Sequence, residues 1–503
     1  MKFNLSERIS KRPWIGWALF LVTVVVVFVL GLFASSIIQR RTEATVKNVP
    51  LYALDENEPR NEMWGKAYPR EYATYQQMSD TSFSSKFNGN SMRDALDEDP
   101  RMVILFAGYS FAKDYNQPRG HIYAITDVRN TLRTGTPLTD TDGPQPSSCW
   151  TCKSPDVLRV MKNIGPEGFY KTMWAGMLSE IVNPIGCANC HNASDQSLRI
   201  AQIPFIEAYQ RLGKNAGDAT LNERRTLVCA QCHVEYYFKG DGKYVTFPWD
   251  KGFSVEDIEK YYDEIAFADW VHPLSKTPII KAQHPDFELF MSSVHFDKGV
   301  SCADCHMPYK TEGSQKITDH KIQSPLNNIT NSCMVCHRDS EEELMHDVYE
   351  RQEKVYEQKI LLEDLLVKAH IETAFAISKG ATSEQLKAIH MYIRQAQWRW
   401  DFVSASHGGS FHAPLECMRI ISSGIEKASL ARIEIARLLA DLGYNEEVPM
   451  PDISTKEKAQ QYVGLDPQKL KTDKEEWKTK VLPQWLAKAE ERERKMPEPK
   501  RIK

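Results

Sequence analysis

The chain has 503 residues, enough for two or three ordinary domains, and its 42% hydrophobic and 26% charged residues are the composition of a soluble protein. A formal net charge of −4 gives no case for nucleic-acid binding. Cysteine is the informative residue, because ten of the eleven cysteines fall in five pairs and only Cys417, predicted to be a buried thiol, is left over.

The first predicted element is a membrane-spanning helix near the N-terminus. No charged residue occurs from Trp14 to Ile38, and about 20 apolar residues suffice to cross a bilayer. Basic residues precede this run and predict a cytoplasmic N-terminus by the positive-inside rule; they are Lys2, Arg8, Lys11 and Arg12. A cleaved signal peptide is the alternative, although its apolar core usually has only about 7–15 residues. We therefore predict residues 1–38 to be an anchor, with the body outside the cytoplasm in either case.

Residues 39–60 are polar and acidic and are predicted to be a tether, and residues 61–340 follow with all ten paired cysteines. Turn signals interrupt this second region, and only Arg101–Phe106 and Lys243–Phe247 have the pattern of short strands. The spacing between the cysteine pairs is irregular, so they are not copies of one long repeat. We expect short helices and loops wrapped around cofactors.

Each cysteine pair has two residues between its members and a potential metal ligand directly after it. Four pairs are followed by histidine: Cys187–Cys190–His191, Cys229–Cys232–His233, Cys302–Cys305–His306 and Cys333–Cys336–His337. Cys-x-x-Cys-His is the attachment signature of c-type haem, in which two thiols bond to the porphyrin and the imidazole reaches the iron. Zinc ligands come in fours, which would strand one pair, and a redox disulfide motif would occur once, near a βαβ pattern. The motifs therefore predict five covalently bound haem c groups.

The remaining motif, Cys149–Trp150–Thr151–Cys152–Lys153, is the first in the chain and has a lysine in place of the histidine. An amine binds iron only when it is neutral, and free lysine has a pKa of about 10.4, so the metal must displace a proton. The alternative is a solvent-exposed Lys153, with another residue as the iron ligand. A single haem that is built unlike the others is the natural candidate for an open position that binds substrate.

The remaining histidines outnumber the second axial ligands that four electron-transfer haems require. Two fixed ligands minimise rearrangement when the iron changes its oxidation state. Ten histidines lie outside the motifs, and the sequence alone does not pair them with haems: His121, His272, His284, His295, His320, His346, His370, His390, His407 and His412.

Three long helices are predicted after the last motif. Glu341–Ser378 is almost free of Gly and Pro and has apolar residues at helical spacing. Thr382 or Ser383 is predicted to cap a second helix that runs to about Ser406, and Pro414–Leu442 has the pattern of a third. The apolar stripe of these helices either faces a partner in a homodimer or covers the haem core, and both interpretations stay open.

The composition changes again near the C-terminus. Residues 341–445 form the long-helix region, whereas residues 446–503 are rich in Lys, Glu and Pro. We predict that this last segment is a charged, peripheral tail with short helices.

Given these motifs, the chain resembles the pentahaem cytochrome c nitrite reductase (ammonia-forming) family from about Trp64 to Leu442, and the Cys-x-x-Cys-Lys motif is the most specific part of the likeness. The resemblance implies a mainly α, multihaem cytochrome c fold with little sheet, a haem-packed core and long C-terminal helices. It also implies a six-electron reduction of nitrite to ammonium at the haem held by Cys149, Cys152 and Lys153. Four bis-histidine haems would supply the electrons.

The same resemblance implies a catalytic trio and a calcium site outside the motifs. The trio would be Arg133, Tyr236 and His284, with Arg119 as a rival to the first and Tyr237 as a rival to the second. One Ca²⁺ would take oxygen ligands, as a hard cation requires. These ligands would be the Glu235 carboxylate, the backbone carbonyls of Tyr236 and Lys281, and the side chain of Gln283.

Distal haem ligands are implied in the same way. His121 would serve the third-motif haem, His320 the second, His295 the fifth, and His412, rather than His407, the fourth. His346, His370 and His390 are left as packing or surface residues, and His272 has no assigned role.

Finally, the resemblance implies a protein on the periplasmic face of the bacterial inner membrane, in the form of a homodimer. Its electron donor would be a quinol-oxidising multihaem membrane cytochrome. Two alternatives stay open: a multihaem electron relay without substrate chemistry, and a related reductase acting on sulfite or hydroxylamine.

Overall fold

The computed structural model describes residues 10, 12–44, 50–312 and 315–502. Contacts divide the chain into two units, one of Met1–Val49 with Tyr309–Thr318 and one of Pro50–Pro308 with Asp319–Lys503. Three of the basic residues that predict the topology, Lys2, Arg8 and Lys11, lie outside the described residues, as do residues 45–49 of the predicted tether.

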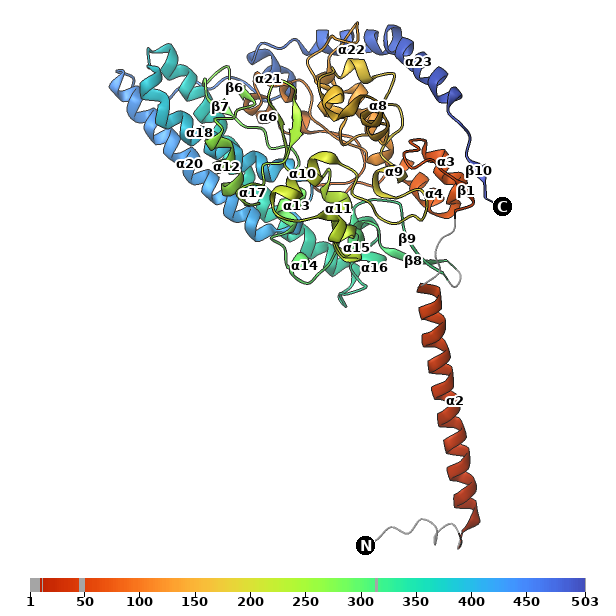
Figure 1. Cartoon of the computed structure of the whole chain (residues 1–503). Coiled ribbons are helices and arrows are strands. Elements are labelled where there is room, and N and C mark those ends of the chain that lie inside the picture. The colour runs from red at the N-terminus through yellow and green to blue at the C-terminus, as the bar shows by residue number, and fades with distance from the viewer. Residues whose placement is uncertain (1–9, 11, 45–49, 313–314, 503) are drawn as a thin grey trace. The chain divides into compact units, whose positions relative to one another are not determined.

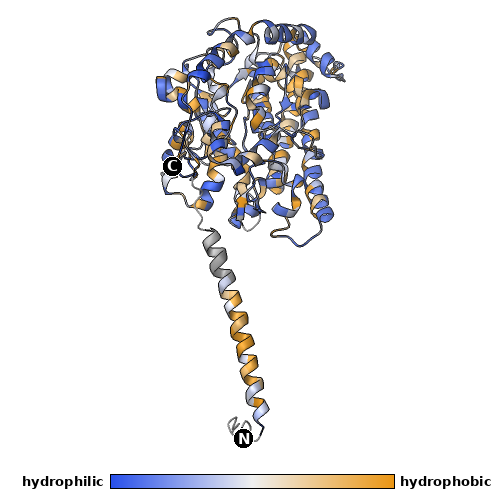
Figure 2. Ribbon diagram, turned by 90° about the vertical axis from the view of Figure 1, so that its right-hand side faces the viewer, coloured by the Kyte–Doolittle hydropathy of each residue, from blue (hydrophilic) through white to orange (hydrophobic). Residues whose placement is uncertain are grey.

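The first unit contains the predicted N-terminal apolar helix and a hairpin. Helix α2 spans Pro13–Ala44, and its part Pro13–Ser35 has a mean hydropathy of 2.8 and is long and apolar enough to cross a membrane. Proline is suited to a first helical position, since its missing N–H would have no partner there. Figure 2 shows the hydrophobic run along this helix. Strands β8 (Tyr309–Glu312) and β9 (Gln315–Thr318) pair antiparallel.

The second unit is mainly helical, which confirms the predicted fold class. Among its described residues, strands occur only as two-stranded antiparallel pairs. These pairs are β1 (Tyr52–Ala53) with β10 (Lys500–Arg501), β2 (Arg93–Asp94) with β3 (Asn116–Gln117), β4 (Tyr237–Lys239) with β5 (Tyr244–Thr246), and β6 (Trp270–Val271) with β7 (Pro278–Ile279).

Short helices joined by loops make up the region of the cysteine motifs, as predicted. They are α3 (Asn61–Ala67), α4 (Pro69–Gln76), α5 (Ala95–Glu98), α6 (Arg101–Leu105), α7 (Ala124–Asn130), α8 (Asp156–Tyr170), α9 (Cys187–Cys190), α10 (Ile203–Arg211), α11 (Leu221–Ala230), α12 (Val255–Glu264), α13 (Asp286–Phe290), α14 (Val294–Asp297), α15 (Cys302–His306) and α16 (Ile329–Ser332).

One predicted strand is wrong. Arg101–Phe106 is not extended but contains helix α6. A short apolar run that is buried on all sides cannot be assigned to helix or strand by periodicity. Here the N-terminal turn decides, because the Asp99 carboxylate accepts a hydrogen bond from the Arg101 backbone N–H at 3.2 Å. The other predicted strand, Lys243–Phe247, contains β5.

The three long helices lie side by side (Figure 1) and match their predicted ranges. They are α17 (Glu341–Ser378), α18 (Ser383–Ala405) and α20 (Pro414–Asp441), with the single turn α19 (Gly409–His412) between the last two. Capping boxes start the first two, in which Ser340 pairs with Glu343 and Thr382 with Gln385. Helices α17 and α20 approach closely at Gly424, where an added Cβ would lie 2.6 Å from a Leu362 methyl carbon.

The segment predicted as a charged tail forms α21 (Lys456–Tyr462), α22 (Pro467–Lys480) and α23 (Leu482–Lys495). Its surface is charged, but Trp477 and Trp485 are buried in the same hydrophobic cluster as Trp150 and Trp174. The C-terminal helices therefore contribute to the core around the lysine motif.

Candidate active site

Each motif histidine lies opposite one of the predicted distal histidines. Metal–imidazole bonds of about 2 Å place the ring centres of two opposite ligands roughly 6 Å apart. The ring centres are separated by 6.1 Å for His233 and His121, 5.9 Å for His191 and His320, 6.3 Å for His337 and His295, and 6.2 Å for His306 and His412. Each separation leaves room for one iron atom between the two rings, so the histidines present fit four bis-histidine haems.

Burial favours the neutral form of three of these imidazoles, which is the form that binds a metal. Removal from water lowers the pKa of His121 to about 3, and those of His191 and His412 to about 4. His407, the rival for the fourth-motif haem, instead packs its ring 4.6 Å from that of His284. The ring across from His306 is therefore that of His412, 6.2 Å away, and its role as the distal ligand stays a prediction.

The cysteine motifs lie next to one another. Cys152 of the lysine motif lies close enough to Cys232 of the third motif for the two thiols to shift each other's pKa, and the same holds for Cys229 and Cys302 of the fourth motif. Groups attached at these three motifs would therefore be neighbours, in the order first, third and fourth.

The lysine motif is held by stacked tryptophans. Trp150 is fully buried, lies parallel to Trp174 with ring centres 5.2 Å apart, and donates a hydrogen bond to the Trp174 carbonyl at 3.0 Å. The Lys153 backbone N–H closes the turn on the Trp150 carbonyl at 2.9 Å. The charge of Lys153 contributes to the lowered pKa values of His121 and His284, which places its ammonium near both rings.

Arg133 lies at this motif, whereas its rival does not. Burial raises the pKa of Cys149 to about 11, and the charges of Arg133 and Lys153 oppose that shift. The Arg133 guanidinium lies 4.2 Å above the Phe111 ring, and its Nε donates to Thr131 Oγ1 at 3.1 Å. Arg119 instead forms an ion pair with Asp127 at 2.6 Å and lies 4.0 Å above the Tyr123 ring.

The same distinction separates the two candidate tyrosines. Burial raises the pKa of Tyr236 well above its ordinary value, and the adjacent Cys152 and Cys149 thiols raise it further. Tyr237 points elsewhere, since its hydroxyl lies 2.8 Å from that of Tyr261. Tyr236 is therefore the tyrosine beside the lysine motif.

His284 has a carboxylate partner that the sequence reading missed. Its Nδ1 lies 2.9 Å from Asp286 Oδ2, and the same oxygen lies 3.6 Å from Nδ1 of His233. The other Asp286 oxygen accepts hydrogen bonds from Ser406 Oγ at 2.6 Å and from the Gly408 N–H at 3.1 Å. Burial lowers the pKa of His284, and the Asp286 carboxylate opposes this shift.

Tyr109 is a second residue that the sequence reading missed. Burial raises its pKa, and the Cys149 thiol and the Gln283 side chain lie near enough to its hydroxyl to affect that pKa. It lies forty residues before the lysine motif, and no local pattern in the sequence singles it out.

Three of the four predicted calcium ligands are in contact. Glu235 Oε2 accepts a hydrogen bond from the Gln283 N–H at 2.6 Å, and Gln283 Nε2 lies 3.4 Å from the Lys281 carbonyl. Glu235 is fully buried, and burial raises its pKa well above the ordinary value. The Lys281 ammonium is engaged with Asp401 at 2.8 Å, so it does not pair with Glu235. A buried carboxylate grouped with carbonyl oxygens has the chemistry of a hard-cation site.

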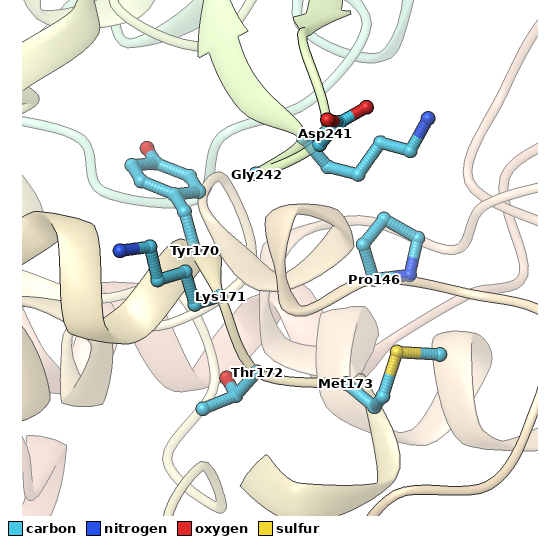
Figure 3. Close-up of a pocket in the computed structure, with 8 residues that line it drawn as sticks. Pro146, Tyr170, Lys171, Thr172, Met173, Asp241 and Gly242 are labelled. Atoms are coloured by element: carbon cyan, nitrogen blue, oxygen red, sulfur yellow. The ribbon is translucent and has the colours of Figure 1, made fainter.

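A surface pocket of about 240 Å³ lies between Pro146, the segment Tyr170–Met173 and the turn Asp241–Lys243 (Figure 3). The described residues that line it include none of the predicted catalytic or ligand residues. Ser148 Oγ donates a hydrogen bond to the Lys243 carbonyl, so the turn supports the segment that leads into the lysine motif.

Comparison with known proteins identifies the family of the chain. The family model of cytochrome c552 matches residues 60–495. A cytochrome c-552 of Parabacteroides distasonis is 56% identical over 96% of this chain and 98% of its own length, and one of Porphyromonas gingivalis is 54% identical over 95% and 96%. A cytochrome c nitrite reductase of Desulfovibrio desulfuricans, described with two calcium sites, is 29% identical, has a TM-score of 0.72, and the match covers 83% of this chain and 91% of that chain. The chain therefore belongs to the cytochrome c552 family, the family of the pentahaem cytochrome c nitrite reductases.

Proposed function

We propose that this protein is an oxidoreductase that reduces nitrite to ammonium with electrons from a cytochrome. The observation that carries this proposal is the contrast between the five motifs. Four motif histidines each face a second ring at a distance that leaves room for one iron atom. At the lysine motif, in contrast, Arg133 and Tyr236 lie near the cysteines and His284 lies near Lys153. Four centres are thus arranged to pass electrons and one to bind a substrate.

The proposed reaction requires a metal centre, electrons and protons. The reaction consumes one nitrite, six electrons and eight protons and yields one ammonium ion and two water molecules. The haem at Cys149 and Cys152, with Lys153 as its ligand, would supply the iron that holds the substrate and the electrons that reduce it.

The residues of the chain would bind the anion and deliver the protons. Arg133 is charged at every relevant pH and presents fixed donors to a nitrite oxygen. His284 would donate protons, and the Asp286 carboxylate would assist by holding the ring in place and by opposing the lowering of the His284 pKa by burial. The hydroxyl of Tyr236 is a further donor.

A calcium ion would fix the segments that carry Tyr236 and His284. We propose that Glu235, Gln283 and the carbonyls of Tyr236 and Lys281 bind one Ca²⁺. The hydrogen bond between Glu235 and Gln283 supports this proposal, because it joins the two segments at the site. Both catalytic side chains lie next to ligand residues in the sequence, so their positions would depend on the ion.

We propose that helix α2 anchors the protein to the periplasmic face of the inner membrane, where a quinol-oxidising multihaem cytochrome would donate electrons. Its apolar run of 23 residues supports a membrane segment, retained or cleaved. We also propose a homodimer through the long helices. Apolar side chains that are exposed on α17 and α18, among them Leu361 and Met391, support this proposal.

The test is an anaerobic assay of the purified holoprotein with a reduced viologen dye and ¹⁵N-labelled nitrite. The proposal expects labelled ammonium, with six dye electrons consumed for each nitrite. Reduction of all haems by the dye without consumption of nitrite would identify an electron relay instead. Turnover of sulfite or hydroxylamine alone would move the activity to a related reductase.

A further inference from the structure

We infer that Lys474, on the C-terminal helix α22, is a positioning residue for Arg133. It would hold the turn that carries this arginine against the lysine motif. The inference rests on the proposed role of Arg133 in binding the substrate anion.

Lys474 binds the end of the Arg133 turn directly. Its Nζ donates hydrogen bonds to Thr134 Oγ1 at 3.0 Å and to the Gly135 carbonyl at 2.8 Å, and the residue is only 2% exposed. Thr134 Oγ1 in turn donates to the Thr131 carbonyl at 3.0 Å, which closes the turn Leu132–Thr134. Thr134 and Gly135, which accept these hydrogen bonds from Lys474, directly follow Arg133 in the chain.

The turn is held at both ends by side chains of opposite charge. At its start, Asp114 Oδ2 accepts hydrogen bonds from Thr131 Oγ1 at 2.8 Å and from the Leu132 N–H at 3.0 Å. At its end, Lys474 binds the carbonyl side. A helical turn is stabilised by a carboxylate at its first N–H groups and by a donor at its last carbonyls, because these groups have no hydrogen-bond partner within the turn. Burial lowers the pKa of Lys474 to about 7, but both hydrogen bonds require only N–H donors, so the contact fixes the position of both groups whether the amine is charged or neutral.

Helix α22 also reaches the lysine motif. The Lys474 ammonium lies 4.3 Å from the Trp477 ring and 5.9 Å from the Trp174 ring. Trp174 stacks on Trp150 inside the motif, and Trp174 and Trp477 have ring centres 6.2 Å apart. One ammonium therefore contacts both the Arg133 turn and the aromatic stack behind the lysine motif.

Two further contacts attach the C-terminal helices to the segment after Arg133. Trp477 Nε1 donates to the Pro137 carbonyl at 2.6 Å, and Trp485 Nε1 donates to Asp140 Oδ1 at 2.8 Å. Figure 1 shows α22 and α23 following one another along this side of the unit, above α8. The hydrogen bonds from Lys474, Trp477 and Trp485 are spaced along the loop from Thr134 to Asp140, so α22 and α23 together fix the position of this loop.

The test compares Lys474→Met with Lys478→Met in the full-length holoprotein. Met keeps the length and apolar stem of lysine but has no donor, and Lys478 is a control on the same helix, where its ammonium pairs with Glu475. Displacement of a binding group by about 1 Å can cost on the order of a hundredfold in rate. We expect Lys474→Met to raise the KM for nitrite and the Kd of nitrite for the oxidised protein by tenfold or more, with a smaller change in kcat. Lys478→Met should match the wild type.

Kinetics with hydroxylamine, which is uncharged, distinguish a displaced Arg133 from general damage to the fold. Loss of anion binding raises the KM for nitrite much more than that for hydroxylamine, whereas a damaged fold affects both substrates equally. Lys474→Arg keeps a donor and should recover part of the nitrite affinity. If Lys474→Met fails to assemble its haems, Trp477→Phe tests the contact of α22 with the loop instead, because it removes the indole donor to the Pro137 carbonyl and keeps an aromatic ring, and it should raise the KM for nitrite. A wild-type KM in Lys474→Met or in Trp477→Phe, or an equal loss for both substrates, would overturn the inference. The proposed function fails separately, if the wild type itself makes no ammonium.

Discussion

Oδ2 of Asp286 lies 2.9 Å from Nδ1 of His284 and 3.6 Å from Nδ1 of His233. One carboxylate thus lies between the predicted proton donor and the motif histidine of a neighbouring haem site. Because the other Asp286 oxygen is held by Ser406 and the Gly408 backbone, the carboxylate itself has a fixed orientation. Its position gives the first prediction.

Asp286→Asn should lower nitrite turnover by about tenfold to a hundredfold, the usual cost of removing a group that orients a metal-site residue. The amide has nearly the same shape but no charge, so His284 loses its electrostatic partner. Steady-state kinetics with a viologen dye would measure the change. Ser406→Ala, which leaves the contact with His284 intact, should show a smaller loss. An Asp286→Asn protein with wild-type kcat would remove Asp286 from the account.

Lys153→His should keep the haem covalently attached, because both cysteines remain, but should slow nitrite turnover. Imidazole is a different ligand field, and it would make the first motif like the other four. Pyridine haemochrome analysis would give five haems per chain, and the ammonium assay would report the loss. Full turnover by this variant would count against a special role for the lysine.

Removal of calcium should lower the activity, because Glu235 and Gln283 join the segments that carry Tyr236 and His284. Chelation followed by dialysis should reduce nitrite turnover, and added Ca²⁺ should restore it. Mg²⁺ should not, since it is smaller and demands near-ideal octahedral geometry. Glu235→Gln should already be low and should not respond to Ca²⁺. A fully active protein in which elemental analysis finds no calcium would contradict this prediction.

A buried histidine outside the haem sites predicts sensitivity to acid. His370 is fully buried between Ser275 Oγ at 2.8 Å and Gln397 Oε1 at 2.6 Å, and burial lowers its pKa from 6.5 to about 4. The unfolded chain then binds more protons than the folded one between these values. The contribution is present above pH 6.5 and is lost as the pH falls toward 4, by on the order of 2 kcal/mol at pH 5.

Thermal unfolding at pH 7.5 and pH 5 would measure this effect. His370→Gln is expected to be less stable at pH 7.5 and to lose less stability on acidification than the wild type. His346→Gln, at an exposed position on α17, is the matched control and should keep the wild-type dependence. An equal loss of stability between pH 7.5 and pH 5 in the two variants would show that His370 does not titrate as described.

The helical framework could be predicted because its determinants are local. Ser340 and Thr382 start α17 and α18 with capping boxes that are visible in the sequence. Arg101–Phe106 was assigned wrongly because an apolar run without periodicity fits both a strand and a buried helix. Its helical turn depends on Asp99, a contact that the pattern of apolar residues does not show.

The site divides in the same way. Motif spacing identifies the attachment residues, but the pairing of His306 with His412 depends on how α15 and α19 meet in space. Asp286 and Lys474 were missed because a single carboxylate or lysine carries no pattern. Lys474 lies more than three hundred residues from the turn that it binds.

The central claim is that one haem, the one attached at Cys149 and Cys152, has an open position while the other four are closed on both sides. Electron paramagnetic resonance of the oxidised holoprotein, recorded before and after addition of nitrite, tests this most directly. The account predicts four low-spin haems that nitrite leaves unchanged and one haem with a distinct signal that nitrite converts. Five low-spin bis-histidine signals, all insensitive to nitrite, would contradict it.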